Sequence, residues 1–286
     1  MRPTIIFIAG AWMICTMQSL RADSVVLNNG QTLNAVAFRR TADGLVVSTE
    51  VPGPGGKPMY ADQTVPLKEI SRVECTPPAA LKSVAGLLSQ GNTSAALATL
   101  EPAVSAVDPL GDLPGSPWPE LAMVYAQSLL AAGNDAQASV VIGKLSKPID
   151  TQAAASALQA LRTARRGDYE KVGALASPVI TPRGNPAVVA TASIAQGLAL
   201  LAQKKYQESL LCFLEQPVFA PDATALSAMA QRGAAECYFG MEDFDRAIGT
   251  LEGLLKTQPS GPEAKAAQTL LEKYRHRKQV VEHSKK

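Results

Sequence analysis

Histidine, cysteine and aromatic residues are all scarce in this chain. Of its 286 residues only two are histidines, His276 and His283, and both lie near the carboxyl end. The body of the chain therefore lacks the commonest general base and metal ligand. The four cysteines include no pair at C-x-x-C spacing, and aromatic residues make up 5%. These shortages disfavour a structural zinc site, a disulfide-rich scaffold and an aromatic sugar-binding platform.

Neither sign of charge is in excess. When Arg2 and Arg21 of the amino-terminal segment are set aside, 25 basic and 25 acidic residues remain. A polyanion-binding protein needs a basic excess on one face, which this composition does not supply. The chain also lacks the H-E-x-x-H, G-x-S-x-G, Walker and dinucleotide-binding motifs. We therefore expect no nucleic-acid partner, no cofactor, no bound metal and no enzymatic activity.

Residues 1–22 have the pattern of a signal peptide. Arg2 precedes an apolar run from Ile5 to Met17, and the small residue Ala22 ends the segment. An uncleaved amino-terminal anchor is the alternative, because Leu20 is bulky where a small residue is typical. Both interpretations predict export, with the periplasm as the preferred compartment. No later segment reaches about 18 uninterrupted apolar residues, so we expect no membrane span after leader cleavage.

Residues 23–76 are predicted to form a small β domain. The pairs Asn29-Gly30 and Asp43-Gly44 separate apolar stretches and supply the positive φ angles that tight hairpins need. The tract from Pro52 to Pro58 predicts a loop before the last strands. The pattern predicts about four or five short strands in a barrel-like domain. The run from Val25 to Leu33, together with the segment from Val65 to Val73, resembles the small SH3-like or Sm-like β modules of exported bacterial proteins.

After Pro77-Pro78 the apolar period lengthens to between three and four, which predicts helices as far as the carboxyl end. The 46 alanines of the chain favour close helix packing. Turn signals recur between the apolar stretches, at Gly91-Asn92, Gly133-Asn134, Gly167-Asp168, Lys204-Lys205 and Glu242-Asp243. The spacing between Tyr169 and Tyr206 is 37 residues, and that between Tyr206 and Phe244 is 38. Both values are typical of a helical-hairpin repeat.

The last copy carries the clearest repeat pattern. Its first helix carries Ala234, Ala235 and Tyr238, Phe244 follows the turn, and its second helix carries Ala247, Leu251 and Leu254 before Pro259. The preceding copy matches at Gly197, Leu200, Tyr206 and Phe213. This pattern resembles the tetratricopeptide repeat (TPR). The resemblance implies a mainly α chain, with a TPR-like α-solenoid of about five helical hairpins over residues 77–259.

Residues 260–286 are predicted to form a carboxyl-terminal capping helix with a basic tail. Pro262 and Glu263 are typical of a helix start. An apolar stripe follows, made of Ala264, Ala267, Leu270, Leu271 and Tyr274. This stripe would cover the exposed face of the last repeat.

The TPR resemblance implies recognition of a partner without chemistry, because TPR proteins generally hold a peptide in a concave groove. The groove positions transferred to this chain are Met123, Gln127, Leu130, Leu161, Arg165, Ile194, Leu198, Leu201, Arg232, Glu236 and Phe239. We expect an exported scaffold or adaptor that binds a protein or peptide in cell-envelope assembly or maintenance. The alternative is an accessory envelope protein whose β module binds glycan or another small ligand. Self-association, and a disulfide between Cys212 and Cys237, stay open.

Overall fold

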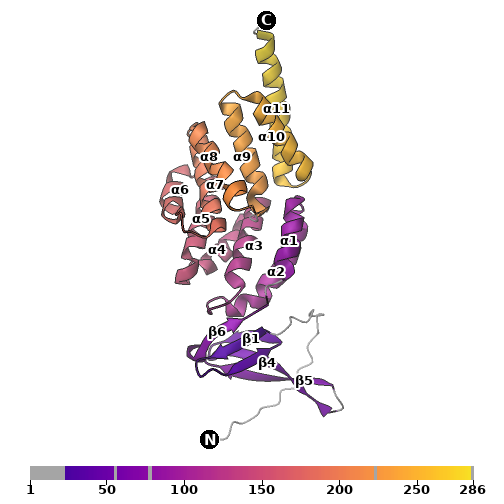
Figure 1. Cartoon of the computed structure of the whole chain (residues 1–286), viewed down its shortest axis with the longest axis vertical. Coiled ribbons are helices and arrows are strands. Elements are labelled where there is room, and N and C mark those ends of the chain that lie inside the picture. Colours follow the sequence, from indigo (N-terminus) through magenta and orange to yellow (C-terminus); the bar gives the residue numbers. More distant parts are fainter. Residues whose placement is uncertain (1–22, 55–56, 77–78, 222–223, 285–286) are drawn as a thin grey trace. The chain divides into compact units, whose positions relative to one another are not determined.

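The chain divides into two compact units, which we describe separately (Figure 1). The computed structural model describes residues 23–54, 57–76, 79–221 and 224–284. The β unit holds the chain up to Thr76 together with Leu113–Gly115, and the helical unit holds Pro77–Asp112 and Ser116–Lys286. The fold is mainly helical with a small amino-terminal antiparallel sheet region. The expected signal peptide, residues 1–22, lies outside the described residues.

The described part of the β unit contains two three-stranded antiparallel sheets. In one, the order is β2 (Thr32–Ala35), β1 (Asp23–Leu27) and β6 (Ile70–Glu74). In the other, the order is β3 (Ala37–Thr41), β4 (Gly44–Pro52) and β5 (Pro58–Val65). Only Val36 separates β2 from β3, so this stretch passes from one sheet to the other. The core side chains of this unit include Val25, Leu45, Val47, Val65 and Val73.

Strand β5 begins at Pro58, where the predicted loop ends. It pairs with β4 from Leu45 and Val65 to Pro52 and Pro58 at the tip. All its residues except Val65 are exposed, so the strand shows no alternation of buried and exposed positions. Pairing with β4 therefore forms this strand, and no hydrophobic period in its own sequence could predict it.

A short piece of the loop after α2 belongs to the β unit. The backbone N–H of Val73 donates to the carbonyl of Pro114 at 2.8 Å. Gly115 has a φ of +81°, and a Cβ at this position would lie 2.3 Å from the Val73 carbonyl oxygen. Only glycine allows this approach, because the Cβ of any other residue would overlap the backbone of β6.

The described residues of the helical unit form eleven α-helices. The first six are α1 (Ala79–Ser89), α2 (Thr93–Val107), α3 (Trp118–Ala132), α4 (Asp135–Leu145), α5 (Gln152–Arg165) and α6 (Tyr169–Ala176). The others are α7 (Pro186–Ala202), α8 (Tyr206–Phe219), α9 (Ser227–Gly240), α10 (Phe244–Thr257) and α11 (Pro262–Ser284). None of these described helices is both long and apolar enough for a membrane span.

Five tight turns repeat one backbone geometry and fall at the predicted signals. Each has a residue with φ between 61° and 84°, namely Gly91, Gly133, Gly167, Lys204 and Glu242. The next residue caps the following helix with φ near −85°, and its N–H donates to the carbonyl five residues earlier, as from Asn92 to Leu87 and from Asp243 to Tyr238. This hydrogen bond satisfies a carbonyl at the end of the first helix. The turns therefore join α1–α2, α3–α4, α5–α6, α7–α8 and α9–α10 as hairpins.

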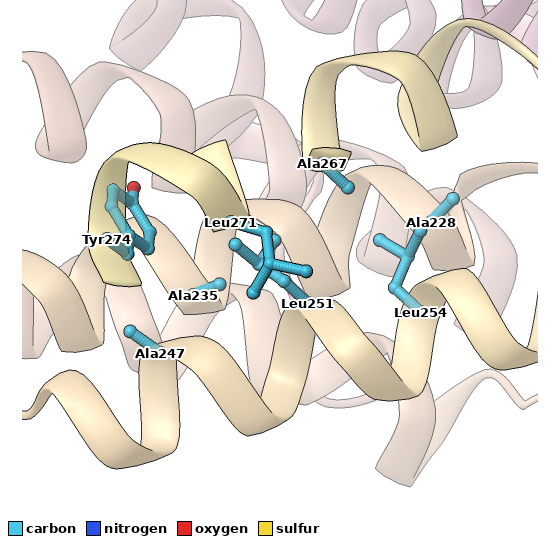
Figure 2. Packing of buried hydrophobic residues seen from close by; sticks show 8 residues of the cluster. All are labelled: Ala228, Ala235, Ala247, Leu251, Leu254, Ala267, Leu271 and Tyr274. Carbon is cyan, nitrogen blue, oxygen red and sulfur yellow. The ribbon is translucent and has the colours of Figure 1, made fainter. Parts of the chain in front are cut away.

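The hairpins pack in sequence order. Each helix contacts the next along the chain, and the first helices of successive hairpins also contact one another, α5 on α7 and α7 on α9 (Figure 1). Helix α11 packs on α9 and α10. Its buried residues Ala267, Leu271 and Tyr274 join a cluster with Ala228, Ala235, Ala247, Leu251 and Leu254 (Figure 2). The predicted apolar stripe of the last helix thus covers the hairpin before it.

The turn of the first hairpin lies against the loop that follows the last hairpin. A Cβ at Gly91, in the turn between α1 and α2, would lie 2.7 Å from the carbonyl oxygen of Ser260, which precedes α11. The short helix η6 (Thr224–Leu226) contacts α1 and α3. Segments that connect the later helices therefore contact the first two hairpins, whereas in an ideal repeat array each repeat touches only its neighbours.

Candidate functional site

Six of the eleven predicted groove residues line one cavity of about 570 Å³, here called the charged cavity. They are Arg165 of α5, Leu198 and Leu201 of α7, and Arg232, Glu236 and Phe239 of α9. On each helix these positions are three or four residues apart, so they share one face. The charged cavity is therefore built mainly by the first helices of three successive hairpins and by α11, while Tyr169 of α6, Lys204 and Tyr206 of α8 add to its wall.

The other five predicted residues lie elsewhere. Leu130, Leu161 and Ile194 are 0–1% exposed and belong to the core, so no partner reaches them in this conformation. Met123 and Gln127 line a second cavity of about 1030 Å³. The Gln127 side-chain amide donates to the Thr191 hydroxyl at 2.8 Å, which ties α3 to α7.

The second cavity, here called the apolar cavity, lies among α1, α3 and the starts of α5 and α7. Leu81, Val84 and Leu88 of α1 form part of its wall. Several prolines contribute to the lining as well, namely Pro117, Pro119, Pro178, Pro186 and Pro221. Its few ionisable residues are Lys82, Glu120 and Asp150. This cavity presents apolar surface rather than a cluster of reactive groups.

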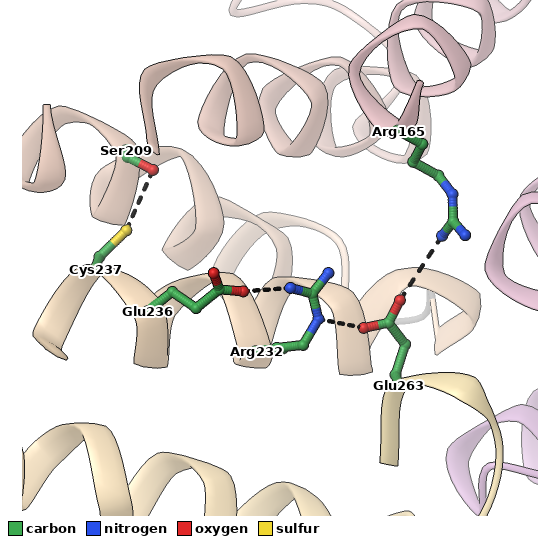
Figure 3. A network of polar contacts seen from close by, with 6 residues as sticks. All are labelled: Arg165, Ser209, Arg232, Glu236, Cys237 and Glu263. Atoms are coloured by element: carbon green, nitrogen blue, oxygen red, sulfur yellow. Dashed lines mark hydrogen bonds and ion pairs between the residues drawn. The ribbon is translucent and has the colours of Figure 1, made fainter. Parts of the chain in front are cut away.

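A chain of ion pairs crosses the charged cavity (Figure 3). The Arg232 guanidinium donates from Nε to Glu263 Oε2 at 2.6 Å and from Nη1 to Glu236. The second carboxylate oxygen of Glu263 lies 3.7 Å from Arg165 Nη1. Glu263 therefore bridges two arginines from different hairpins, and it reaches both of them from the first turn of α11.

The two arginines differ in how fully nearby carboxylates neutralise their positive charge. Burial acts to lower the pKa of Arg232, but Glu263 and Glu236 outweigh burial and raise it overall. Burial lowers the pKa of Arg165, and Glu263 only partly opposes this effect. Arg232 is held by two carboxylates, whereas the ion pair that Arg165 forms with Glu263 is long, at 3.7 Å. Arg165 is thus the arginine with unused capacity for a carboxylate.

Lysines and aromatic rings complete the wall of the charged cavity. Phe239 stacks on Tyr274 with ring centroids 3.9 Å apart, and Lys273 Nζ lies 5.9 Å from the centre of the Phe239 ring. Lys204 lines the cavity from the turn between α7 and α8. Within the described ranges, no carboxylate pairs with Lys204 or Lys273. The lining therefore holds four cations, Arg165, Lys204, Arg232 and Lys273, against the two carboxylates Glu236 and Glu263.

Sequence reasoning missed Lys204, Glu263, Lys273 and Tyr274 as lining residues. It placed Lys204 in a hairpin turn, which is correct, and the other three on a helix that only covers the last hairpin. The repeat pattern identifies positions on the first helices but contains no signal for the path of α11. The predicted groove was consequently mostly apolar, while the cavity in the structure carries a surplus of positive charge.

The cysteines of the helical unit are free thiols. Cys237 is buried and its Sγ lies 3.2 Å from the Ser209 hydroxyl (Figure 3). Burial raises the pKa of both Cys212 and Cys237 to about 11. These thiols are therefore protonated at neutral pH, which is unfavourable for a nucleophile. The structure shows no disulfide between them.

The two histidines lie exposed on α11, and the His283 ring contacts the Gln279 carbonyl at 2.8 Å. No group of three or more metal-ligating side chains occurs among the residues that the structure describes. No protein-family model, curated protein or solved structure matches this chain.

Proposed function

We propose that this chain is a non-enzymatic scaffold or adaptor whose helical unit is a TPR-like array of five hairpins. Five turns with one backbone geometry support the repeat assignment, because the same connection recurs within each pair of helices from α1–α2 to α9–α10. The helix-on-helix contacts between successive first helices, α5, α7 and α9, have the order that such an array requires.

The observation that carries the binding function is the charged cavity. Most of its lining comes from α5, α7, α9 and α11, so its shape depends on how successive hairpins stack. A volume of about 570 Å³ is in the range of sites that hold small ligands or a few side chains. The mixture of cations with Leu198, Leu201 and Phe239 suits a peptide better than an apolar small molecule.

We further propose that the partner is an envelope protein or peptide and that the chain is exported. Support for export comes from residues 1–22, with their basic start and apolar run. The β unit would be a second docking surface. Its strand β5 is exposed along nearly its whole length, including Met59 and Tyr60, and forms an edge of its sheet. Unpaired strand edges are suited to pairing with another chain.

Site-specific photo-crosslinking in the native host tests the function. A photoreactive amino acid at Leu198 places the probe in the charged cavity, and one at the exposed Gln207 of α8 is the matched control. We expect a discrete protein to be captured from Leu198 and not from Gln207. Equal capture at both positions, or capture at neither, would contradict recognition through this cavity.

A further inference from the structure

Glu263 is an unusual component of the charged cavity, because it satisfies cations that belong to other hairpins. It lies at the start of α11, directly after Pro262, and only 14% of its side chain is exposed. Its carboxylate contacts Arg232 at 2.6 Å and Arg165 at 3.7 Å. Without Glu263, the lining would present Arg165, Lys204, Arg232 and Lys273 against Glu236 alone.

We propose that Glu263 stands in for an acidic side chain of the partner, and that the charged cavity binds a peptide segment carrying a carboxylate. This inference rests on the proposed function, whose ligand class it specifies. The partner carboxylate takes the place of Glu263 at Arg165, while Glu263 keeps its shorter contact with Arg232. The chain therefore carries its own competitor for the site.

Arg165 is the point of exchange for geometric reasons. Its contact with Glu263 is the longer of the two, and 27% of its side chain is exposed, compared with 20% for Arg232. A charge-assisted bond at a normal distance is stronger than one at 3.7 Å, so an incoming carboxylate improves the environment of Arg165. Lys204 and Lys273 add positive charge that no carboxylate pairs with in the described parts of the chain.

The uncharged wall narrows the ligand class further. Leu198, Leu201 and Leu270 line the same cavity as the cations, and Phe239 lies beneath Lys273. A carboxylate beside an apolar side chain matches both parts of this lining. The ligand is thus an acidic-apolar peptide segment.

Binding of short amidated peptides to the full-length protein tests this inference. The probes are paired peptides with leucine beside either glutamate or glutamine, and amidation removes the terminal carboxylate. We expect the glutamate peptides to bind and the glutamine peptides not to bind. Glu263→Gln should tighten binding of the glutamate peptides about fivefold, because removal of an internal competitor raises the fraction of competent sites.

Two further variants keep the result interpretable. Arg165→Gln should weaken binding of the glutamate peptides about tenfold, since it removes the exchanged contact while leaving Glu263 on Arg232. Glu252→Gln is the matched control, because Glu252 pairs with Arg275 away from the cavity and should leave affinity unchanged. Thermal melting of each variant shows whether it folds. If Glu263→Gln does not fold, the affinity of Arg165→Gln decides the outcome.

The inference is overturned if glutamine peptides bind as well as glutamate peptides, if no peptide binds, or if folded Glu263→Gln shows unchanged or weaker binding. Any of these results leaves the proposed function intact when Leu198 still captures a discrete protein. Loss of that capture, in contrast, removes the proposed function itself.

Discussion

At the scale of single residues, two of the hairpin turns place a residue other than glycine at a positive φ angle. Three of the turns place glycine at the position with positive φ, whereas Lys204 and Glu242 occupy it in the last two at φ of 61° and 63°. A residue with a Cβ is strained in this left-handed region by about 1–2 kcal/mol. Lys204 has a place in the wall of the charged cavity, but the exposed Glu242 lines neither of the two cavities described here.

Glu242→Gly should therefore stabilise the helical unit. Relief of strain is partly offset by the greater freedom of glycine in the unfolded chain, which leaves a gain of about 0.5–1 kcal/mol in the free energy of unfolding. Urea denaturation followed by circular dichroism measures it. Glu242→Ala is the control, because it removes the charge and keeps the Cβ. An equal gain from alanine would assign the effect to charge and refute the strain argument.

At the scale of secondary-structure elements, one aromatic ring explains how α7, α8 and α9 approach. Phe213 of α8 is 1% exposed, and its ring lies over Gly197 of α7 and Gly233 of α9. A Cβ at Gly233 would lie 2.4 Å from the ring. The repeat pattern predicted an aromatic residue at Phe213, but the sequence does not indicate that Gly233 opposes it, since the two helices meet only in the folded chain.

Because Gly233 contacts Phe213, we expect the effect of Gly233→Ala on stability to change sign when Phe213 is removed. Gly233→Ala should destabilise the native protein, because the added carbon overlaps the ring. In a Phe213→Ala background the same change should stabilise by about 1 kcal/mol, since alanine favours helix over glycine and the clash is gone. A double-mutant cycle by urea denaturation measures this coupling.

Gly253→Ala on α10 is the matched control for this cycle. A Cβ at Gly253 has nothing within 4 Å, so alanine should stabilise in both backgrounds. Identical effects of Gly233→Ala with and without Phe213 would show that the ring does not set the spacing between α8 and α9.

At the scale of the whole molecule, α11 both covers the last hairpin and completes the charged cavity. Its apolar side contributes Ala267, Leu271 and Tyr274 to a buried cluster, and its first turn contributes Glu263. Two cations near its basic end pair with α10, Arg275 with Glu252 and Lys278 with Asp245, both at 2.6 Å. These pairs give the tail a structural role within the helical unit.

Deletion of residues 262–286 should lower stability and promote self-association. It would expose Leu251 and Leu254, which are fully buried in the complete chain, and leave Arg165 and Arg232 without Glu263. Sedimentation velocity and urea denaturation measure the two effects. Deletion of residues 281–286 is the control, because it leaves the apolar side of α11 intact. A monomeric and equally stable long deletion would refute the covering role.

The helices, their five turns and the change from strands to helices follow from the sequence by itself. Helix hydrogen bonds and turn angles connect residues only a few positions apart, so residues such as Gly133 and Asn134 suffice to predict them. Strand β5 and the place of Gly115 in the β unit depend on pairing with distant segments. Tertiary structure alone decided the cavity, because the path of α11 back to Arg165 depends on how every hairpin packs on the one before. Glu263 is an ordinary helix-start residue in the sequence, and it becomes the centre of a charge network only when that packing brings two arginines to it.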